Sequence, residues 1–97
     1  EQGAAEAETV DLAVLAQDVI AELAPAALRE GAELTLKAEQ TLVVGQPILL
    51  GALIRNLVDN ALRHAGAGEV GITVTPAPRP TLSVSDQGPG LSTDARM

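Results

Sequence analysis

The chain has 97 residues, no cysteine, no aromatic side chain and a formal charge of -7 at pH 7. This length suits one domain with a modest core, which must be built from Leu, Ile, Val and Ala. The lack of cysteine excludes disulfides, thiolate metal sites and cysteine nucleophiles.

The negative charge is confined to the first part of the chain. Residues 1–40 carry nine acidic residues against two basic ones, whereas residues 41–97 carry four of each. Nucleic-acid binding needs clustered Lys and Arg, so we expect no nucleic-acid partner. No apolar run approaches the ~20 residues that span a bilayer, and no basic signal-peptide region opens the chain. Because the sequence also begins without Met, we expect a piece of a longer protein that makes no direct membrane contact itself.

The first predicted elements are a linker and a helix. Residues 1–10 are acidic and Ala-rich without a clear period, which predicts a linker. Asp11 can cap a helix over 12–29, where Leu and Val repeat at helical spacing. Pro25 should kink or divide this helix, and Gly31 should end it.

Strands and a second helix fill the rest of the chain. Alternating apolar and polar residues predict strands over 32–38 and 41–44. A helix is predicted over 47–65, with Pro in its first turn, and two further strands over 69–75 and 81–85. This order predicts an α+β two-layer sandwich, with the helices on one face of a mixed sheet.

The second predicted helix should have a face toward the sheet and a face away from it. This expectation comes from a helical wheel at ~100° per residue. The residues expected to face the sheet are Leu50, Ile54, Leu57 and Ala61, and those expected to face away are Arg55, Asp59 and Leu62.

Two amides one turn apart, Asn56 and Asn60, fall at the edge of this apolar stripe. Unpaired amides at a core boundary are costly, but a ligand or metal can supply their partners. The side-chain oxygen of Asn60 is a hard ligand suited to Mg²⁺, and Arg63 can reach a phosphate. The same amides can also cap turns or bond to nearby backbone, so the helix alone leaves both interpretations open.

A second motif, Asp86-Gln87-Gly88-Pro89-Gly90, follows the last predicted strand. A carboxylate only accepts hydrogen bonds, so Asp86 can bind the exocyclic amine of adenine, where guanine has a carbonyl. Gly88 and Gly90 permit positive φ and a close approach to a flat base. The same residues also suit a plain surface turn. Together, the amide helix and this motif are typical of the two halves of an ATP pocket.

His64 is the only histidine, and we expect it to line the nucleotide pocket or to flank the core rather than to accept a phosphoryl group. The sequence has no Ser-His-Asp order, no His cluster and no P-loop.

The two motifs resemble those of the ATP-binding domain of bacterial sensor histidine kinases, in the superfamily that includes gyrase, Hsp90 and MutL. Residues 53–65 are similar to the N box of that family, and residues 86–91 are similar to its G1 box. The resemblance covers nearly all of the chain from Val10 onward. It implies a Bergerat-type ATP-binding fold that is incomplete at its C-terminal end.

The resemblance also implies roles for the N-box side chains, with ATP and Mg²⁺ as cofactors. Asn60 would ligate the Mg²⁺ that bridges the phosphates, and Asn56 would support that site from one turn back. Arg63 would contact phosphate, and His64 would lie near the ribose or base.

The G1-box residues would hold the base. Asp86 would bind the adenine amine directly and through water, and Gly88 and Gly90 would shape the pocket floor.

The chain departs from the family pattern at both ends. No F box, lid, second glycine box or final strand and helix follows the G1 box, and no phosphoacceptor domain precedes residue 11. We therefore expect a partial ATP-binding domain over 11–97 with an open sheet edge, weak or no ATP binding, and no autophosphorylation.

The resemblance implies a parent that phosphorylates a histidine on a separate dimerisation domain of the same protein, for relay to a response regulator. Such a parent would sit in the inner membrane with this domain in the cytoplasm. One alternative is a serine-directed anti-sigma kinase or another ATPase of the superfamily, but those relatives usually carry an acidic base where this chain has Asn56. A non-catalytic nucleotide-binding module is the other alternative.

Overall fold

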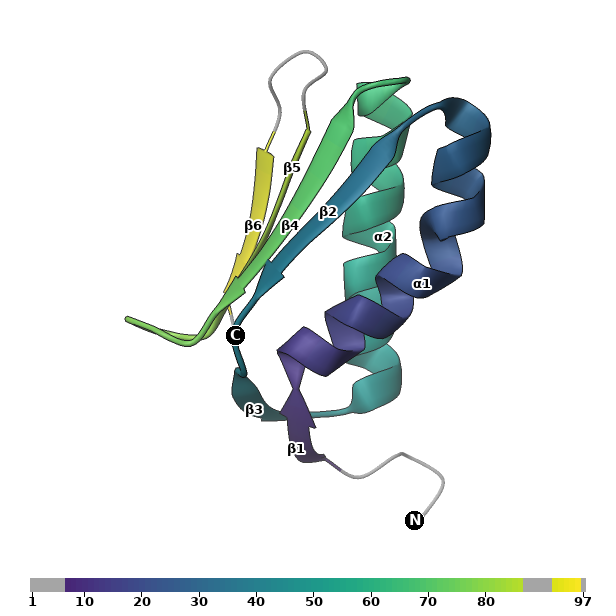
Figure 1. The fold of residues 1–97 in the computed structure, drawn as a ribbon. Coiled ribbons are helices and arrows are strands. Elements are labelled where there is room, and N and C mark those ends of the chain that lie inside the picture. The colour runs from purple at the N-terminus through teal and green to yellow at the C-terminus, as the bar shows by residue number, and fades with distance from the viewer. Residues whose placement is uncertain (1–6, 87–91, 97) are drawn as a thin grey trace.

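The structure is a computed structural model that describes residues 7–86 and 92–96. Figure 1 shows two layers, with both helices on the same side of a twisted sheet. The predicted α+β two-layer sandwich is therefore confirmed. The elements, in chain order, are β1 (Glu8–Asp11), α1 (Leu12–Glu30), β2 (Glu33–Ala38), β3 (Leu42–Gly45), α2 (Pro47–Ala65), β4 (Glu69–Thr75), β5 (Thr81–Asp86) and β6 (Ser92–Arg96).

The main sheet has four strands in the order β2-β4-β5-β6. β2 runs parallel to β4, whereas the β4–β5 and β5–β6 pairs are antiparallel, so the sheet is mixed, as predicted. α1 packs on β2, and α2 packs on β4 and β5. Alternate residues of the two central strands point toward the helices, because side chains alternate between the faces of a strand. The buried ones are Val70, Ile72, Val74, Leu82 and Val84.

The core-facing side of α2 is wider than the helical wheel predicted. Ile54 is fully buried and Ala61 is buried, as expected, and Leu57 is partly buried. The prediction was wrong for Leu62, which was placed away from the sheet but is only 7% exposed. α1 packs along that side of α2, so the apolar arc faces a helix as well as the sheet.

Residues 8–10 were predicted as part of a linker, and this was wrong. They belong to β1, which pairs antiparallel with β3 in a separate two-stranded sheet, with Thr9 opposite Val44. Val10 is 9% exposed and anchors the strand. A single apolar residue with polar neighbours on both sides, Thr9 and Asp11, is too short a pattern to stand out as a strand in the sequence.

A hydrogen-bond network around Asp11 joins the start of α1 to the β2–β3 connection. The Asp11 carboxylate accepts from the backbone N–H groups of Ala13 (3.0 Å) and Thr41 (3.1 Å). The Leu12 N–H donates to the Thr41 carbonyl at 2.8 Å. Thr41 is fully buried, and its hydroxyl donates to the Glu39 carbonyl at 2.8 Å. Asp11 therefore caps α1, as predicted, and also fixes where β3 begins.

α1 remains one helix although Pro25 lies inside it. Its ribbon changes direction in the second half, which agrees with the predicted kink (Figure 1). Gly31 ends the helix with φ of 75°, a left-handed conformation that suits glycine.

The far side of β5 is covered by β6, which places Ala95 opposite Leu82. No strand was predicted over residues 92–96, whereas an open sheet edge was expected on this side. Within the described residues, the outer strands of the sheet are β2 and β6.

Asp11→Ala should lower the free energy of unfolding by about 1–2 kcal/mol, because it removes a helix cap and leaves the Thr41 N–H without its acceptor. Asp11→Asn keeps an acceptor oxygen and should cost less. Urea denaturation followed by circular dichroism measures both. The control is Asp18→Ala on the exposed side of α1, which should stay within about 0.5 kcal/mol. Equal losses for Asp11→Ala and Asp18→Ala would contradict this role.

Candidate functional site

The C-terminal half of α2 and the end of β5 lie at the same end of the molecule. α2 leads into β4, and β5 runs back antiparallel to β4, so Asp86 lies opposite Val70. Residues opposite each other in such a pair share a face of the sheet. Val70 is fully buried beneath the helices, so Asp86 belongs to the helix-covered face. Figure 1 shows both segments at the upper end.

The two amides of α2 lie on its outer surface. Asn56 and Asn60 are both exposed, so the predicted position at the core boundary was wrong, and neither amide bears a burial cost. Within the described residues, neither side-chain amide bonds to a turn or to nearby backbone. Both amides therefore remain accessible to a ligand.

Arg63 and His64 are held by contacts within α2. The Arg63 guanidinium lies 3.1 Å from the Asp59 carboxylate, and the Arg63 side chain is 76% exposed. The Nδ1 atom of His64 lies 2.9 Å from the Asn60 backbone carbonyl. An exposed pair one turn apart is weak, so a phosphate group can compete with Asp59 for Arg63.

A groove of about 400 Å³ lies between the C-terminal parts of the two helices. Asn56, Asn60 and Asp86 do not line this groove, whereas Arg63 does, together with two carboxylates. Its lining residues are Ala26, Glu30, Asp59, Leu62, Arg63 and Gly66. Gly88 and Gly90, which were expected to complete the nucleotide pocket, lie outside the described residues.

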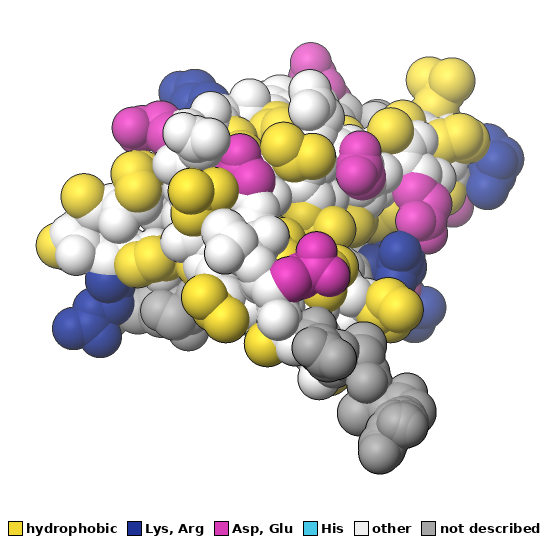
Figure 2. All heavy atoms as spheres, turned by 90° about the horizontal axis from the view of Figure 1, so that it is seen from below, with side chains coloured by type: hydrophobic (Ala, Val, Ile, Leu, Met, Phe, Trp, Pro, Cys, Tyr) yellow, Lys and Arg dark blue, Asp and Glu magenta, His cyan; other side chains and the backbone are white. Residues whose placement is uncertain are grey.

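An apolar surface patch extends from α2 to β3, and the sequence reasoning missed it. Leu49 and Leu53 precede Asn56 and Asn60 by seven residues each, so they share the outer side of α2 with the amides. This spacing was the available signal, but the helical wheel assigned neither Leu49 nor Leu53 to a side of the helix. Figure 2 shows the end of the molecule where such side chains gather. The patch consists of Leu42, Val44, Ile48, Leu49 and Leu53, which are 38–76% exposed.

A bidentate ion pair joins α1 to α2 beside Asn56. The Arg55 guanidinium donates to the Glu22 carboxylate over 2.7 Å and 2.9 Å. These hydrogen bonds lower the pKa of Glu22 below its ordinary value of 4.5 and raise the pKa of Arg55. The pair links the two helices at the level of Asn56.

The described residues contain no cluster of three or more acidic or histidine side chains that could hold a metal. Mg²⁺ needs no such cluster, because it is often bound by one or two protein oxygens together with substrate phosphates and water. The exposed amide oxygen of Asn60 fits this mode of binding. Neither described helix is long and apolar enough to cross a bilayer.

Comparison with known proteins identifies the family to which the fold and the two motifs belong. Residues 45–97 match the family model described as "Histidine kinase-, DNA gyrase B-, and HSP90-like ATPase". The chain belongs to this family.

Sensor kinases are among the similar curated proteins. The sensor protein kinase PmrB of Pseudomonas aeruginosa is 45% identical over 85 residues, which cover 86% of this chain. The sensor protein QseC of Escherichia coli K12 is 44% identical over 62 residues, or 64% of this chain. The matched parts are only 18% and 13% of the two relatives, so this chain spans a small part of their length.

Solved structures agree in fold. The cytoplasmic segment of histidine kinase QseC matches with a TM-score of 0.78 and 28% identity, over 86% of this chain and 55% of that one. The catalytic domain of histidine kinase ThkA matches with a TM-score of 0.80 over 89% of this chain and 62% of that one. At 21% identity, the second match shows the fold alone.

The ion pair between Glu22 and Arg55 should make stability depend on pH. Glu22 has a lower pKa in the folded than in the unfolded chain, so its contribution is complete above the unfolded value and is lost as the pH falls through the folded value. The stability difference between wild type and Glu22→Gln should be small and constant near neutral pH, and should shrink below about pH 4.5. Urea denaturation at several pH values measures it.

The matched control repeats the comparison in an Arg55→Gln background, where Glu22→Gln should cause no such pH-dependent change. If the difference persists in that background, the effect does not come from this pair.

Proposed function

We propose that this domain binds Mg-ATP at the end where α2 meets β5, and that it supplies the nucleotide to a sensor histidine kinase. The observation that carries the proposal is that the C-terminal half of α2, which bears the exposed Asn60, lies at the same end of the molecule as Asp86, which belongs to the helix-covered face of the sheet. Membership of the ATPase family supports a nucleotide as ligand.

Each site residue has a specific proposed task. Asn60 would hold Mg²⁺ through its amide oxygen, and Asn56 would support that site from one turn back. Arg63 exchanges Asp59 for a phosphate oxygen, which is a charge-assisted contact. His64 lies beside the ribose or base.

Asp86 selects the base. Its carboxylate accepts a hydrogen bond from the exocyclic amine of adenine, whereas guanine places a carbonyl there and two acceptors repel each other. The family resemblance assigns Gly88 and Gly90, which follow Asp86 in the sequence, to the binding of the same base.

In the parent protein, the γ-phosphoryl group passes to a histidine on a separate domain and then to a response regulator. Phosphoryl transfer requires mainly positioning and charge stabilisation. The contribution of this domain is therefore to hold the adenine base, the metal and the phosphates in place. The similarity to sensor kinases supports this reaction.

The apolar patch on α2 and β3 is a suitable surface for the histidine-bearing domain, because exposed apolar patches mark protein contacts. Such a parent would present this domain to cytoplasmic ATP.

The main alternative keeps the fold and changes the acceptor to a serine or to water. That chemistry usually needs a general base on the helix, and Asn56 cannot serve as one. The histidine kinase reaction is therefore favoured. The other alternative is a non-catalytic module in which this pocket is unused. In that case Asp86→Asn would leave nucleotide binding by the full-length parent unchanged.

Nucleotide binding can be mapped on this chain by NMR titration with Mg-ADP. Amide signals of Asn60, His64 and Asp86 should shift, whereas those of the β4–β5 turn around Arg79 should not, because that turn lies at the opposite end of both strands. Mg-GDP should cause no comparable shifts. Asp86→Asn should weaken binding by about tenfold, because a charged acceptor is lost.

Asp18→Asn, which removes an exposed carboxylate from α1, is the matched control and should bind like wild type. Equal affinity for ADP and GDP, or an Asp86→Asn variant that binds as wild type does, would refute the proposed base recognition.

A further inference from the structure

The outer edge of β2 is open to another strand. β2 is the end strand of the four-stranded sheet and pairs only with β4 among the described residues. An end strand presents unpaired N–H and C=O groups, which form a template for another chain. This edge is independent of the proposed nucleotide site, which lies on α2 and β5.

Two backbone hydrogen bonds establish which backbone groups of β2 face outward. The Glu33 N–H donates to the Gly68 carbonyl at 3.1 Å, and the Glu39 N–H donates to the Val74 carbonyl at 3.0 Å. Backbone groups alternate in direction along a strand. The backbone groups of odd-numbered residues therefore point to β4, and those of Leu34 and Leu36 point to the open edge.

We propose that two copies of this chain pair antiparallel through β2, with a twofold axis at Thr35. This register places Leu34 opposite Leu36 of the second copy, and both present outward backbone groups. It also places Glu33 opposite Lys37 of the second copy, twice by symmetry. Cross-strand pairs of opposite charge are favourable, and such self-complementarity is what a twofold interface requires.

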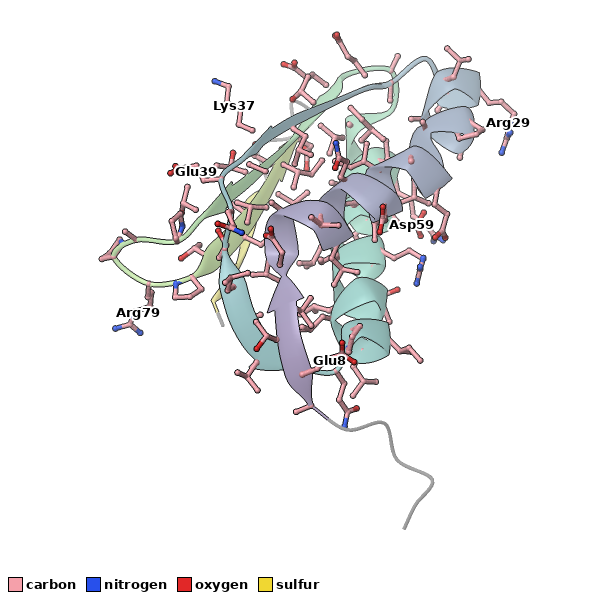
Figure 3. All side chains as sticks on the ribbon, turned by 60° about the horizontal axis from the view of Figure 1, so that its bottom comes forward. Glu8, Arg29, Lys37, Glu39, Asp59 and Arg79 are labelled. Atoms are coloured by element: carbon pink, nitrogen blue, oxygen red, sulfur yellow. The ribbon has the colours of Figure 1, made fainter. Side chains whose placement is uncertain are left out.

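Neighbouring registers lack this match. An axis at Leu36 would place Glu33 opposite Glu39, a pair of like charges. An axis at Leu34 would place Glu33 opposite Thr35, so the opposite-charge pairs would disappear. Figure 3 shows Lys37 projecting from β2 away from the helices, where it is free to meet a carboxylate.

An apolar groove beside this edge gives a second reason for a partner. A groove of about 360 Å³ lies between α1 and β2, and its lining includes Ile20, Ala24, Leu28 and Leu34. Leu28 is 80% exposed, so the apolar lining of the groove is open to another chain. The second copy's Leu36 would extend the apolar surface at Leu34. Ala24 lies in this lining and is exposed, and its small side chain would leave room for α1 of the second copy.

A single introduced cysteine tests the axis. Opposed residues of a non-hydrogen-bonded antiparallel pair have Cα atoms about 4.5 Å apart, which lies within the disulfide range. The chain has no other cysteine, so Thr35→Cys should give a disulfide-linked dimer under mild oxidation. The matched control is Thr73→Cys, which is exposed but lies on β4 between two strands. Non-reducing electrophoresis measures the rate of cross-linking.

Charge reversal tests the register. Glu33→Lys and Lys37→Glu should each lower self-association by roughly tenfold in sedimentation equilibrium, because each places like charges opposite one another twice. An equimolar mixture of the two variants should regain dimer formation, because the mixed pair is complementary again. The double variant Glu33→Lys, Lys37→Glu should also dimerise.

The proposal is overturned if Thr35→Cys cross-links no faster than Thr73→Cys, or if mixing the two charge variants restores nothing. Circular dichroism of each variant separates loss of pairing from loss of fold.

Discussion

The packing of α2 against the sheet is the constraint on which the rest of the structure depends. Ile54 and Val58 are fully buried, and they fix both the height and the rotation of the helix. A helix has 3.6 residues per turn, so burying these positions turns Asn56 and Asn60 to the opposite side. The amides are exposed because Ile54 and Val58 occupy the buried side of the helix. The ion pair between Arg55 and Glu22 then links α2 to α1.

The sequence predicted those parts of the fold that repeat a pattern several times. α2 and β4 have the predicted bounds, because each has a long periodic run between glycine or proline signals. β1 and β6 were missed, since a strand of four or five residues with one apolar position carries little signal. Leu62 was misplaced because a wheel drawn for one helix ignores a second helix beside it. The candidate residues were found from residue chemistry and motif resemblance, but their exposure depended on packing that the sequence does not show.

The lack of aromatic side chains shapes both the core and the surface. The core consists of aliphatic residues of moderate size, so each one buries little area and many are needed. A small two-layer domain cannot bury them all. Leu28 beside β2 and Leu49 beside the amides remain exposed at opposite margins of the helix layer. Surfaces of this kind become stabilising only in contact with another chain or domain, so the same composition that limits the core favours association.

The topology explains why the two halves of the proposed site must occur in this order and at this spacing. α2 delivers the chain to one end of the sheet, β4 leaves that end over seven residues, and β5 returns over six. A single strand between the motifs would leave the carboxylate at the opposite end of the sheet. A register shift of one residue in β5 would turn Asp86 to the open face, because side chains alternate. The β4–β5 hairpin is therefore a geometric requirement if one nucleotide is to contact both the amides of α2 and Asp86 at the end of β5.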